Sequence, residues 1–325
     1  MIVTGPNPAG SPSHSQARGP WAEATVHVLS HAIQRGSLVF DYMSVHDLDV
    51  RAAAAGLPAG PAIFRLRAHV DRFFLSCEMM GLPVAQSAET LLSAIGQTVR
   101  ANPGARAVKI SAYFASVEID VVPVDDHVTV AIAAYDPKAD ISDRKARRPP
   151  ARPEFLKLWI EKDVANRRED IVPPQAKVSA NYASPMTAKA RARAAGYDEI
   201  VLVDEDGHLA EGPTTNLFLV DGEGDLITPP GTKVLHGVTR SSILELAKAE
   251  GIAVREAPVE PEALLRASEA FLTGTTAGVW PIASVDGRSL GGCPGPISKT
   301  LRDRFQAVAR GEDPAFAHWL TPVGD

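Results

Sequence analysis

Apolar and polar residues alternate along most of the chain at a period typical of either a helix or a strand. Between residues 66 and 81, Val70, Phe73, Cys77 and Met80 share one helical face, and Gly81 is a favourable stop. A second helix is predicted from the N-cap residue Ser87 to about residue 101. Further helices are predicted at 184–196, 241–250, 261–267 and 296–310.

Short runs rich in β-branched and aromatic residues lie between these helices and predict strands. The runs cover residues 25–29, 37–40, 108–122, 128–135, 199–203, 209 onward, 217–220 and 226–228. Two of the turns between them, at 204–207 and 221–224, carry the Asp and Gly residues typical of hairpins. Strands interspersed with helices in this way predict an α+β fold.

Composition divides the chain into an arm, two domains and a linker. Ten of the first twenty residues are Gly, Pro or Ser, so residues 1–20 are predicted to form a flexible arm. Residues 137–153 contain four Pro and six Lys or Arg residues, which favours a linker. The expected domains are therefore a small α/β domain at 21–136 and a larger one at 154–325, and 325 residues suffice for two cores.

Bulk properties exclude several classes of function. The net charge of −6 gives no basic surface for nucleic acid or an anionic membrane. No apolar run approaches the roughly 20 residues that span a bilayer, and the N-terminus lacks the pattern of a signal peptide. Only two cysteines occur, Cys77 and Cys293, in settings that do not suggest a disulfide. The expected location is the cytoplasm.

Two ionisable residues stand in settings that suggest covalent cofactor chemistry. Lys177 lies among small and apolar residues, in the run that ends at Tyr182, and Glu211 lies at a turn that leads into the strand through Asn216. A poorly solvated amine loses proton affinity and can form a Schiff base. A buried acid can keep a heteroaromatic nitrogen protonated, which makes the ring an electron sink. Pyridoxal phosphate chemistry requires both groups.

The segments around these residues carry a family resemblance. The run from Lys177 to Phe218, the stretch Gly237-Val-Thr-Arg240 and the stretch Thr273-Gly-Thr-Thr-Ala277 resemble the class IV, fold type IV, pyridoxal-phosphate-dependent aminotransferases, and among them the branched-chain amino acid aminotransferases. The resemblance extends from about residue 26 to about residue 308. It implies a small N-terminal α/β domain, a larger C-terminal pseudo-barrel domain, and a homodimer or higher homo-oligomer in which a neighbour's loop closes each active site.

The resemblance also implies a role for each matching residue. Lys177 would form the Schiff base with pyridoxal phosphate and carry the proton, whereas its residue type alone is more typical of a solvated lysine. Glu211 would face the pyridine nitrogen, unless it only stabilises a turn. The remaining cofactor contacts would be Tyr182 to the phenolic oxygen, Leu235 against the ring, and Arg72, Val238, Thr239 and Thr275 to the phosphate.

The substrate side of the pattern departs from the branched-chain enzymes. In the stretch that should form the pocket, the family's Tyr, Gly and Arg are replaced by Arg35, Tyr42 and Ser44, around a retained Phe40. On a second strand, alignment places Val108-Lys109-Ile110 at the family's Tyr-x-Arg, whose arginine binds the distal carboxylate of glutamate. Glutamate is therefore expected to be a poor amino donor, unless Arg35 or Lys109 supplies the cation. The substrate-binding residues implied by the resemblance are Arg35, Phe40, Tyr42, Lys109, Thr276 and Ala277.

Three other functions remain compatible with the sequence. A class IV lyase of the aminodeoxychorismate lyase type, or a transaminase for D-amino acids or (R)-amines, would share the fold and the cofactor. A non-catalytic relative would be expected to have lost the cofactor residues, yet Arg72, Lys177, Tyr182 and Glu211 are all present. The leading prediction is a transaminase that moves an amino group between an amino acid or amine and a 2-oxo acid.

Overall fold

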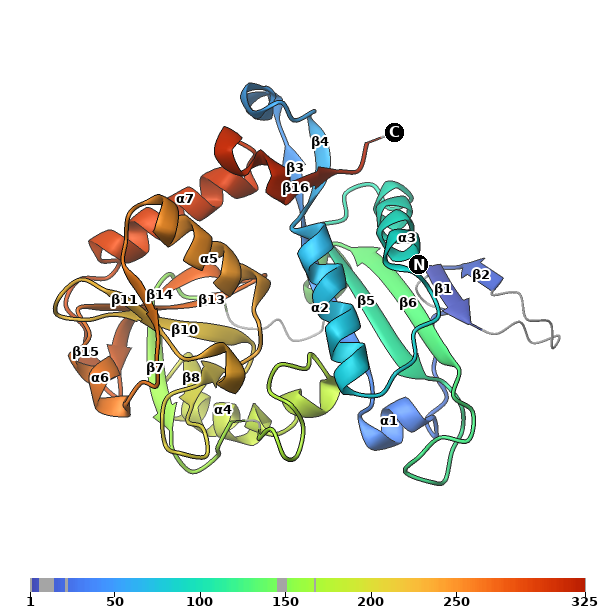
Figure 1. Cartoon of the computed structure of the whole chain (residues 1–325), viewed down its shortest axis with the longest axis horizontal. Helices are drawn as coiled ribbons and strands as arrows, with labels where there is room; N and C mark the ends of the chain where they lie inside the picture. Colours follow the sequence, from blue (N-terminus) through green and yellow to red (C-terminus); the bar gives the residue numbers. More distant parts are fainter. Residues whose placement is uncertain (1, 6–14, 21–22, 145–150, 167, 325) are drawn as a thin grey trace. The chain divides into compact units, whose positions relative to one another are not determined.

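The structure, a computed structural model, describes residues 2–5, 15–20, 23–144, 151–166 and 168–324 (Figure 1). The chain divides into two compact units, described separately below. The first comprises residues 1–150, 176–180 and 308–325, and the second comprises residues 151–175 and 181–307. The first boundary, after residue 150, falls inside the predicted linker. The second domain was predicted to extend to residue 325. That boundary is wrong, because residues 308–325 belong to the first unit.

The first unit is built on an antiparallel sheet. Its order is β16-β4-β3-β5-β6-β1-β2, in which the central strands are β4 (Gly60–Phe64), β3 (Val39–Leu48), β5 (Ala107–Phe114) and β6 (Val128–Tyr135). Two helices, α2 (Leu66–Met79) and α3 (Ala88–Arg100), lie along one face of the sheet (Figure 1). Burial alternates along β3: Val39, Asp41 and Met43 are buried, whereas Phe40 and Tyr42 are half-buried. The buried side chains are those on the α2 face, because α2 contacts Asp41 directly.

Both edges of this sheet come from the ends of the chain. The strand β1 (Ile2–Gly5) pairs with β6, and β2 (Ser15–Arg18) pairs with β1, so part of the predicted flexible arm forms strands. At the opposite edge, β16 (Leu320–Pro322) pairs with β4, with Leu320 opposite Phe64. This pairing, and the 3-10 helix η6 (Pro314–Trp319) before it, explain why the C-terminal segment belongs to the first unit.

The second unit contains a sheet that curls on itself. Strands β9 (Glu211–Gly212), β10 (Thr215–Val220), β13 (Glu269–Gly274), β14 (Gly278–Val285), β7 (Leu156–Glu161) and β8 (Glu199–Leu202) pair in that order. The ends then meet: the Ala210 N–H donates to the Leu202 carbonyl, and Val203 bridges to Leu209. Leu158, Val201, Leu217 and Leu272 belong to the apolar core of this curled sheet. The predicted pseudo-barrel is thereby confirmed.

The remaining elements cover or extend these two sheets. In the second unit β11 (Leu226–Thr228) and β12 (Val254–Glu256) extend the sheet beyond β10, and β15 (Arg288–Ser289) pairs with β14. The helices α4 (Pro185–Ala194), α5 (Val238–Ala249), α6 (Pro261–Arg266) and α7 (Pro296–Ala309) lie outside the barrel (Figure 1). These positions confirm the helices predicted from periodicity. Within the described residues, no helix has the length and apolarity needed to cross a membrane.

Two predicted strands differ from the structure. Residues 25–29 form no strand, and all five are exposed, so their alternation lacks a buried face to specify pairing. The strand expected at 108–122 ends at Phe114, and residues 115–127 form a largely exposed segment. In that segment Ile119 is 96% exposed, although apolar and polar residues alternate there as in a strand.

Candidate active site

Lys177 lies in a short extended segment held against the start of β3. Its carbonyl accepts the Phe40 N–H at 3.0 Å, and the Ser179 N–H donates to the Leu38 carbonyl at 2.8 Å. On the α2 side, the Lys177 N–H donates to the hydroxyl of buried Ser76 at 3.0 Å. The backbone of this lysine is therefore fixed on both sides. Its side-chain nitrogen lies 5.0 Å from the centre of the Phe40 ring.

A buried ionic network lies between β3 and α2. Asp41 is fully buried, and Arg72 grips it through two parallel hydrogen bonds, from Nε to Oδ2 and from Nη2 to Oδ1, both at 2.8 Å. The His69 Nδ1–H donates to Oδ1 at 2.7 Å, and so does the Tyr42 N–H, also at 2.7 Å. The predicted phosphate arginine, Arg72, is thus a buried guanidinium oriented by an aspartate.

The network perturbs the protonation of both acid and base. Burial alone would raise the pKa of Asp41, but Arg72 and the hydrogen bond from His69 outweigh it and hold that pKa well below its usual range. Burial lowers the pKa of His69, and the nearby charges of Arg72 and Lys177 lower it further against the opposing effect of Asp41. The imidazole is therefore neutral at physiological pH, with its proton on Nδ1.

The opposite face of β3 and β5, which carries Phe40, Tyr42 and Lys109, is called here the Phe40 face. Lys109 pairs with Tyr42 across the strands, and its amine lies 4.5 Å from the centre of the Phe40 ring. Ile110, which the alignment matches to the family's arginine, is fully buried on the α2 face, opposite Asp41. Lys109 is the residue of this strand that shares a face with Phe40.

Arg35 is not part of the Phe40 face and has a different contact. It is the last residue of α1 (His31–Arg35), it is exposed, and its Nη2 donates to the Ile119 carbonyl at 2.8 Å. His31 bonds similarly, through Nε2, to the Val121 carbonyl at 2.8 Å. Both residues therefore hold the exposed segment 115–127, a role that the sequence did not indicate.

In the second unit, hydrogen bonds from two neighbouring groups hold the carboxylate of Glu211. It is only 2% exposed, and its Oε2 accepts from the Asn216 side-chain amide at 3.1 Å and from the Leu235 N–H at 3.2 Å. Asn216 also donates to the Leu235 carbonyl at 3.0 Å. The predicted ring-nitrogen acid and the predicted ring-packing leucine are therefore neighbours.

The helix α5 begins shortly after Leu235 and presents its N-terminus without a side-chain cap. Gly237 is the N-cap residue, and the first intrahelical hydrogen bond runs from the Ser241 N–H to its carbonyl at 2.9 Å. The N–H groups of Val238 and Thr239 precede that bond and have no partner within the helix. A helix N-terminus of this kind can bind a phosphate through N–H groups and the helix dipole.

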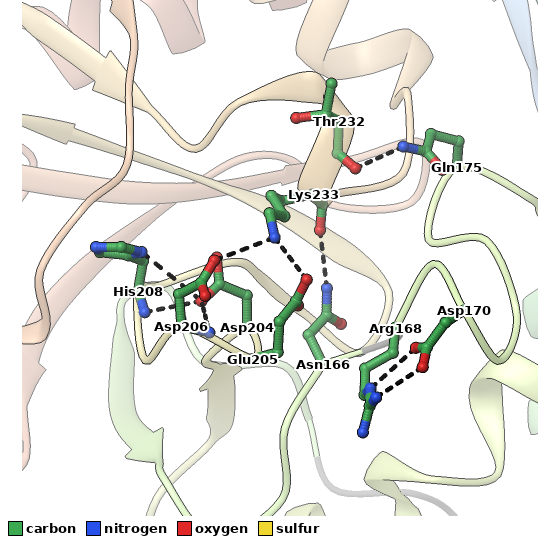
Figure 2. A network of polar contacts seen from close by, with 10 residues as sticks. All are labelled: Asn166, Arg168, Asp170, Gln175, Asp204, Glu205, Asp206, His208, Thr232 and Lys233. Carbon is green, nitrogen blue, oxygen red and sulfur yellow. Dashed lines mark hydrogen bonds and ion pairs between the residues drawn. The ribbon is translucent and has the colours of Figure 1, made fainter.

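The loop that leads to Leu235 is held by a polar network (Figure 2). The Lys233 amine contacts Glu205 at 2.5 Å and Asp206 at 3.3 Å, and the Lys233 carbonyl accepts from the Asn166 amide at 3.1 Å. Gln175 donates to the Thr232 carbonyl at 2.5 Å. The network thus ties the start of α5 to the 204–208 hairpin and to the segment that precedes Lys177.

The turn between β13 and β14 carries the remaining predicted contacts, Thr275, Thr276 and Ala277. Arg152 donates to the Thr276 carbonyl at 2.9 Å and to the Ala277 carbonyl at 3.0 Å, and its guanidinium stacks 3.7 Å from the centre of the Trp280 ring. The turn is therefore fixed by a distant arginine that the sequence did not point to. Arg152 thereby occupies two carbonyl acceptors of the turn.

Tyr182 is the last residue of the short 3-10 helix η4 (Ser179–Tyr182). It is half-buried, next to buried Asn181, whose amide donates to the Pro173 carbonyl at 3.3 Å. That bond fixes the backbone immediately before the phenol.

The polar groups of each unit, taken separately, match pyridoxal phosphate in their chemistry. The first unit offers an amine on Lys177 and an oriented guanidinium on Arg72. The second offers a buried carboxylate on Glu211 and an uncapped helix N-terminus at Val238. Pyridoxal phosphate presents an aldehyde, a phosphate dianion and a basic ring nitrogen, so each of its polar groups has a chemically matched partner.

Comparison with protein families and with characterised sequences gives consistent matches. The family model described as amino-transferase class IV matches residues 50–285. The branched-chain-amino-acid aminotransferase of Escherichia coli strain K12 is 34% identical over 310 residues, which cover 93% of this chain and 94% of that protein. The probable branched-chain-amino-acid aminotransferase of Aquifex aeolicus is 29% identical over 94% of each chain.

Solved structures of the same kind superpose on nearly the whole chain. The branched-chain amino acid aminotransferase of Thermobaculum terrenum, in its PLP-bound holo form, gives a TM-score of 0.81 at 29% identity and covers 94% of this chain and 96% of its own. The Escherichia coli branched-chain enzyme gives a TM-score of 0.81 at 31% identity, with 96% and 97% covered. The architecture is therefore that of fold type IV.

Proposed function

Because this chain belongs to the class IV aminotransferases and is a pyridoxal-phosphate-dependent transaminase, we propose that its substrates are branched-chain-type amino acids and 2-oxo acids, accepted by an altered pocket. The observation that carries this proposal is the preserved pair of Lys177 and buried Glu211 on a chain whose relatives are branched-chain enzymes. The test is an amino-donor screen, scored by loss of the cofactor's visible absorbance and its recovery with a panel of 2-oxo acids.

Lys177 is the proposed point of covalent attachment. Pyridoxal phosphate, when bound, supplies the electron sink of the reaction. The amine of Lys177 would form a Schiff base with it and, once released, move a proton at the substrate α-carbon as general base and then acid. The fixed backbone of Lys177, bonded to Phe40 and Ser76, supports this role because it limits where the amine can reach.

Glu211 is the proposed partner of the ring nitrogen. Two donors, from Asn216 and from the Leu235 backbone, point their hydrogen atoms at its Oε2. An ionised carboxylate at that position would hold a proton on the ring nitrogen. Leu235, whose N–H donates to this carboxylate, is the proposed apolar contact to the ring, and Tyr182 is the proposed donor to the phenolic oxygen.

The proposed phosphate site combines charge with oriented N–H groups. Arg72 would supply the positive charge, and its fixed orientation on Asp41 supports a defined hydrogen-bond geometry. The Val238 and Thr239 N–H groups would supply the helix N-terminus. Thr275, on the turn held by Arg152, would add a hydroxyl or backbone donor.

The proposed substrate contacts begin with the Phe40 face. Tyr42 stands where relatives are expected to have glycine, so it narrows the pocket, and Lys109 adds a cation beside the Phe40 ring. We propose that Lys109 replaces the missing arginine for any substrate with a distal carboxylate. Arg35, Thr276 and Ala277 remain proposed contacts, although Arg35 also holds the Ile119 carbonyl.

The lyase and the D-amino-acid or (R)-amine transaminase are not favoured, because the matching relatives are branched-chain aminotransferases. Product analysis separates the reactions. A lyase would release pyruvate without an amino acceptor, whereas a transaminase requires one. Chiral analysis of the amino product separates L- from D-specific transfer.

A homodimer is the proposed assembly. Val117, Ile119, Val121, Val122 and Val124 in the segment 115–127 are all more than half exposed, and α1 holds this segment in place. An ordered apolar surface of this kind favours burial by another protein chain, and the family resemblance implies a second copy. Light scattering should give twice the chain mass, and Ile119→Asp should shift the mass toward that of one chain.

The cytoplasm is the proposed location, in keeping with a pair of cysteines, Cys77 and Cys293, that are not bonded to one another. Fractionation of the source cells, with immunodetection of the chain, would test it.

A further inference from the structure

Asn216 touches three functional features of the second unit at once. It lies on β10, it is 5% exposed, and its side-chain amide donates to Glu211 Oε2 at 3.1 Å and to the Leu235 carbonyl at 3.0 Å. Both partners are pure acceptors, so both amide N–H groups are used and the orientation of the amide is fixed by chemistry. Its carbonyl end then points toward Gly237.

The contact with Gly237 is unusually close. A Cβ atom added to Gly237 would lie 2.0 Å from Asn216 Oδ1 and 3.1 Å from its Cγ. The φ of Gly237 is −64°, which any L-residue adopts, so the backbone conformation does not require glycine here. Glycine is required because the asparagine side chain occupies the place of a side chain at the N-cap of α5.

We propose that Asn216 is a positioning residue that sets the spacing between the carboxylate of Glu211 and the N-terminus of α5. This inference rests on the proposed function, in which the two groups bind opposite ends of one rigid ring. A rigid ligand needs its two binding groups at a fixed separation, and a small displacement of either weakens both contacts. One amide bonded to the acid and packed against the N-cap maintains that separation.

The amide also influences the charge of Glu211. Its N–H donor stabilises the ionised carboxylate in a buried place. Replacing the amide by a carboxyl, as in Asn216→Asp, puts two acids side by side, so one of them must take up a proton. The protonated form can still donate one hydrogen bond, whereas the ionised form repels Glu211.

The primary test is the affinity for pyridoxal phosphate, measured by equilibrium dialysis with full-length protein. Asn216→Ala should weaken binding about tenfold or more, because a hydrogen bond to a charged group is lost. The matched control is Thr228→Val, which removes a fully buried donor to the neighbouring Leu217 carbonyl but touches neither Glu211 nor Gly237. The control should bind within about threefold of wild type. If Asn216→Ala does not fold, Asn216→Ser, which keeps one donor, takes its place.

Asn216→Asp supplies a signature that loss of packing would not produce. At each pH, its affinity for pyridoxal phosphate is divided by that of wild type. This ratio should rise as the pH is lowered from 8 to 6, because protonation of the introduced carboxyl restores a donor toward Glu211. An affinity ratio that does not change with pH would overturn the electrostatic part of the proposal.

A double-mutant cycle on thermal unfolding of the cofactor-free protein tests the contact itself. Gly237→Ala should destabilise the wild type strongly but have a much smaller effect in the Asn216→Ala background, where the clash is relieved. Additive effects would overturn the contact. If wild type binds the cofactor and Asn216→Ala binds it as tightly as Thr228→Val does, the positioning role of Asn216 is wrong while the proposed function stands. If wild type itself does not bind, the proposed function fails, and the cycle still tests the contact.

Discussion

The two units hold their candidate functional groups by different physical means. In the first, Arg72 is fixed by a buried ion pair with Asp41, which also accepts a hydrogen bond from the neutral His69. In the second, Glu211 is fixed by a neutral amide and a backbone N–H. Ionic fixation couples the site to pH and to fold stability, because removing one partner leaves a buried charge. A neutral amide, in contrast, adds no charge of its own beside the acid.

The largest effect on turnover is expected from the first unit, at Lys177. Lys177→Ala removes both the covalent attachment and the proton carrier, so turnover should fall by at least about a thousandfold. Stability should change much less than turnover, since the Lys177 side chain is only half-buried. Steady-state kinetics and thermal unfolding measure the two effects. Normal turnover in this variant would contradict the proposed mechanism.

In the second unit, Glu211→Gln should slow turnover by about a hundredfold or more while pyridoxal phosphate remains bound. A neutral amide cannot hold a proton on the ring nitrogen. Single-turnover kinetics with a saturating amino acid isolate the chemical step. An unchanged rate would mean that Glu211 acts only in the turn and in the contact with Leu235.

Asp41→Asn, in the first unit, should cause a large loss of fold stability. Breaking the buried pair leaves the Arg72 charge uncompensated, which should lower the unfolding free energy by about 3–5 kcal/mol. The matched control is Asp71→Asn, which breaks the exposed Arg67–Asp71 pair on the same helix and should cost about 1 kcal/mol or less. Chemical denaturation compares them. Equal effects would show that the buried network has no special weight.

Lys109→Ala should change substrate preference by about tenfold, against substrates with a distal carboxylate, and spare apolar ones. Glutamate should already be a poor donor for wild type relative to a typical branched-chain enzyme. Arg35→Ala provides the comparison, because Arg35 is exposed and bonded to Ile119. If glutamate is an efficient donor and both variants retain it, the assignment of the Phe40 face is incorrect.

The smallest effect concerns pH. Because the pKa of His69 is lowered below its ordinary value of 6.5, the unfolded chain binds a proton that the native chain does not, so stability declines as the pH falls below about 6.5. The depressed pKa of Asp41 adds a contribution that is present above pH 3.8 and is lost as the pH falls further. His69→Gln should flatten the decline between pH 6.5 and 5. An identical slope in that variant would exclude His69 as its source.

Local patterns predicted the parts of the fold that local interactions determine. Helices such as α2 and α3 follow from apolar periodicity and from the Ser87 cap, whose hydroxyl accepts the Thr90 N–H. The strands β1 and β16, near the two ends of the chain, depend on pairing with distant partners, which no local pattern encodes. The segments 25–29 and 115–122 alternate like strands, but they have no buried face.

The residues of the candidate site also fall into two groups: those that local sequence patterns indicate, and those that only the fold brings into contact. Lys177 and Glu211 stand in contiguous motifs, so the sequence pointed to both. Asp41, Asn216 and Arg152 act through contacts made across 31, 19 and 124 residues of chain, and only the folded structure reveals them. The strand register likewise becomes visible only in the fold, where Lys109, and not Ile110, lies beside Phe40.

Lys177 is the proposed lysine that binds the cofactor covalently. Borohydride reduction of the protein loaded with pyridoxal phosphate, followed by proteolysis and mass spectrometry of the peptides, tests it directly. We expect one phosphopyridoxyl group per chain, on Lys177, and none in Lys177→Ala. A label on Lys109, the other amine beside the Phe40 ring, or no label at all on wild type, would contradict it.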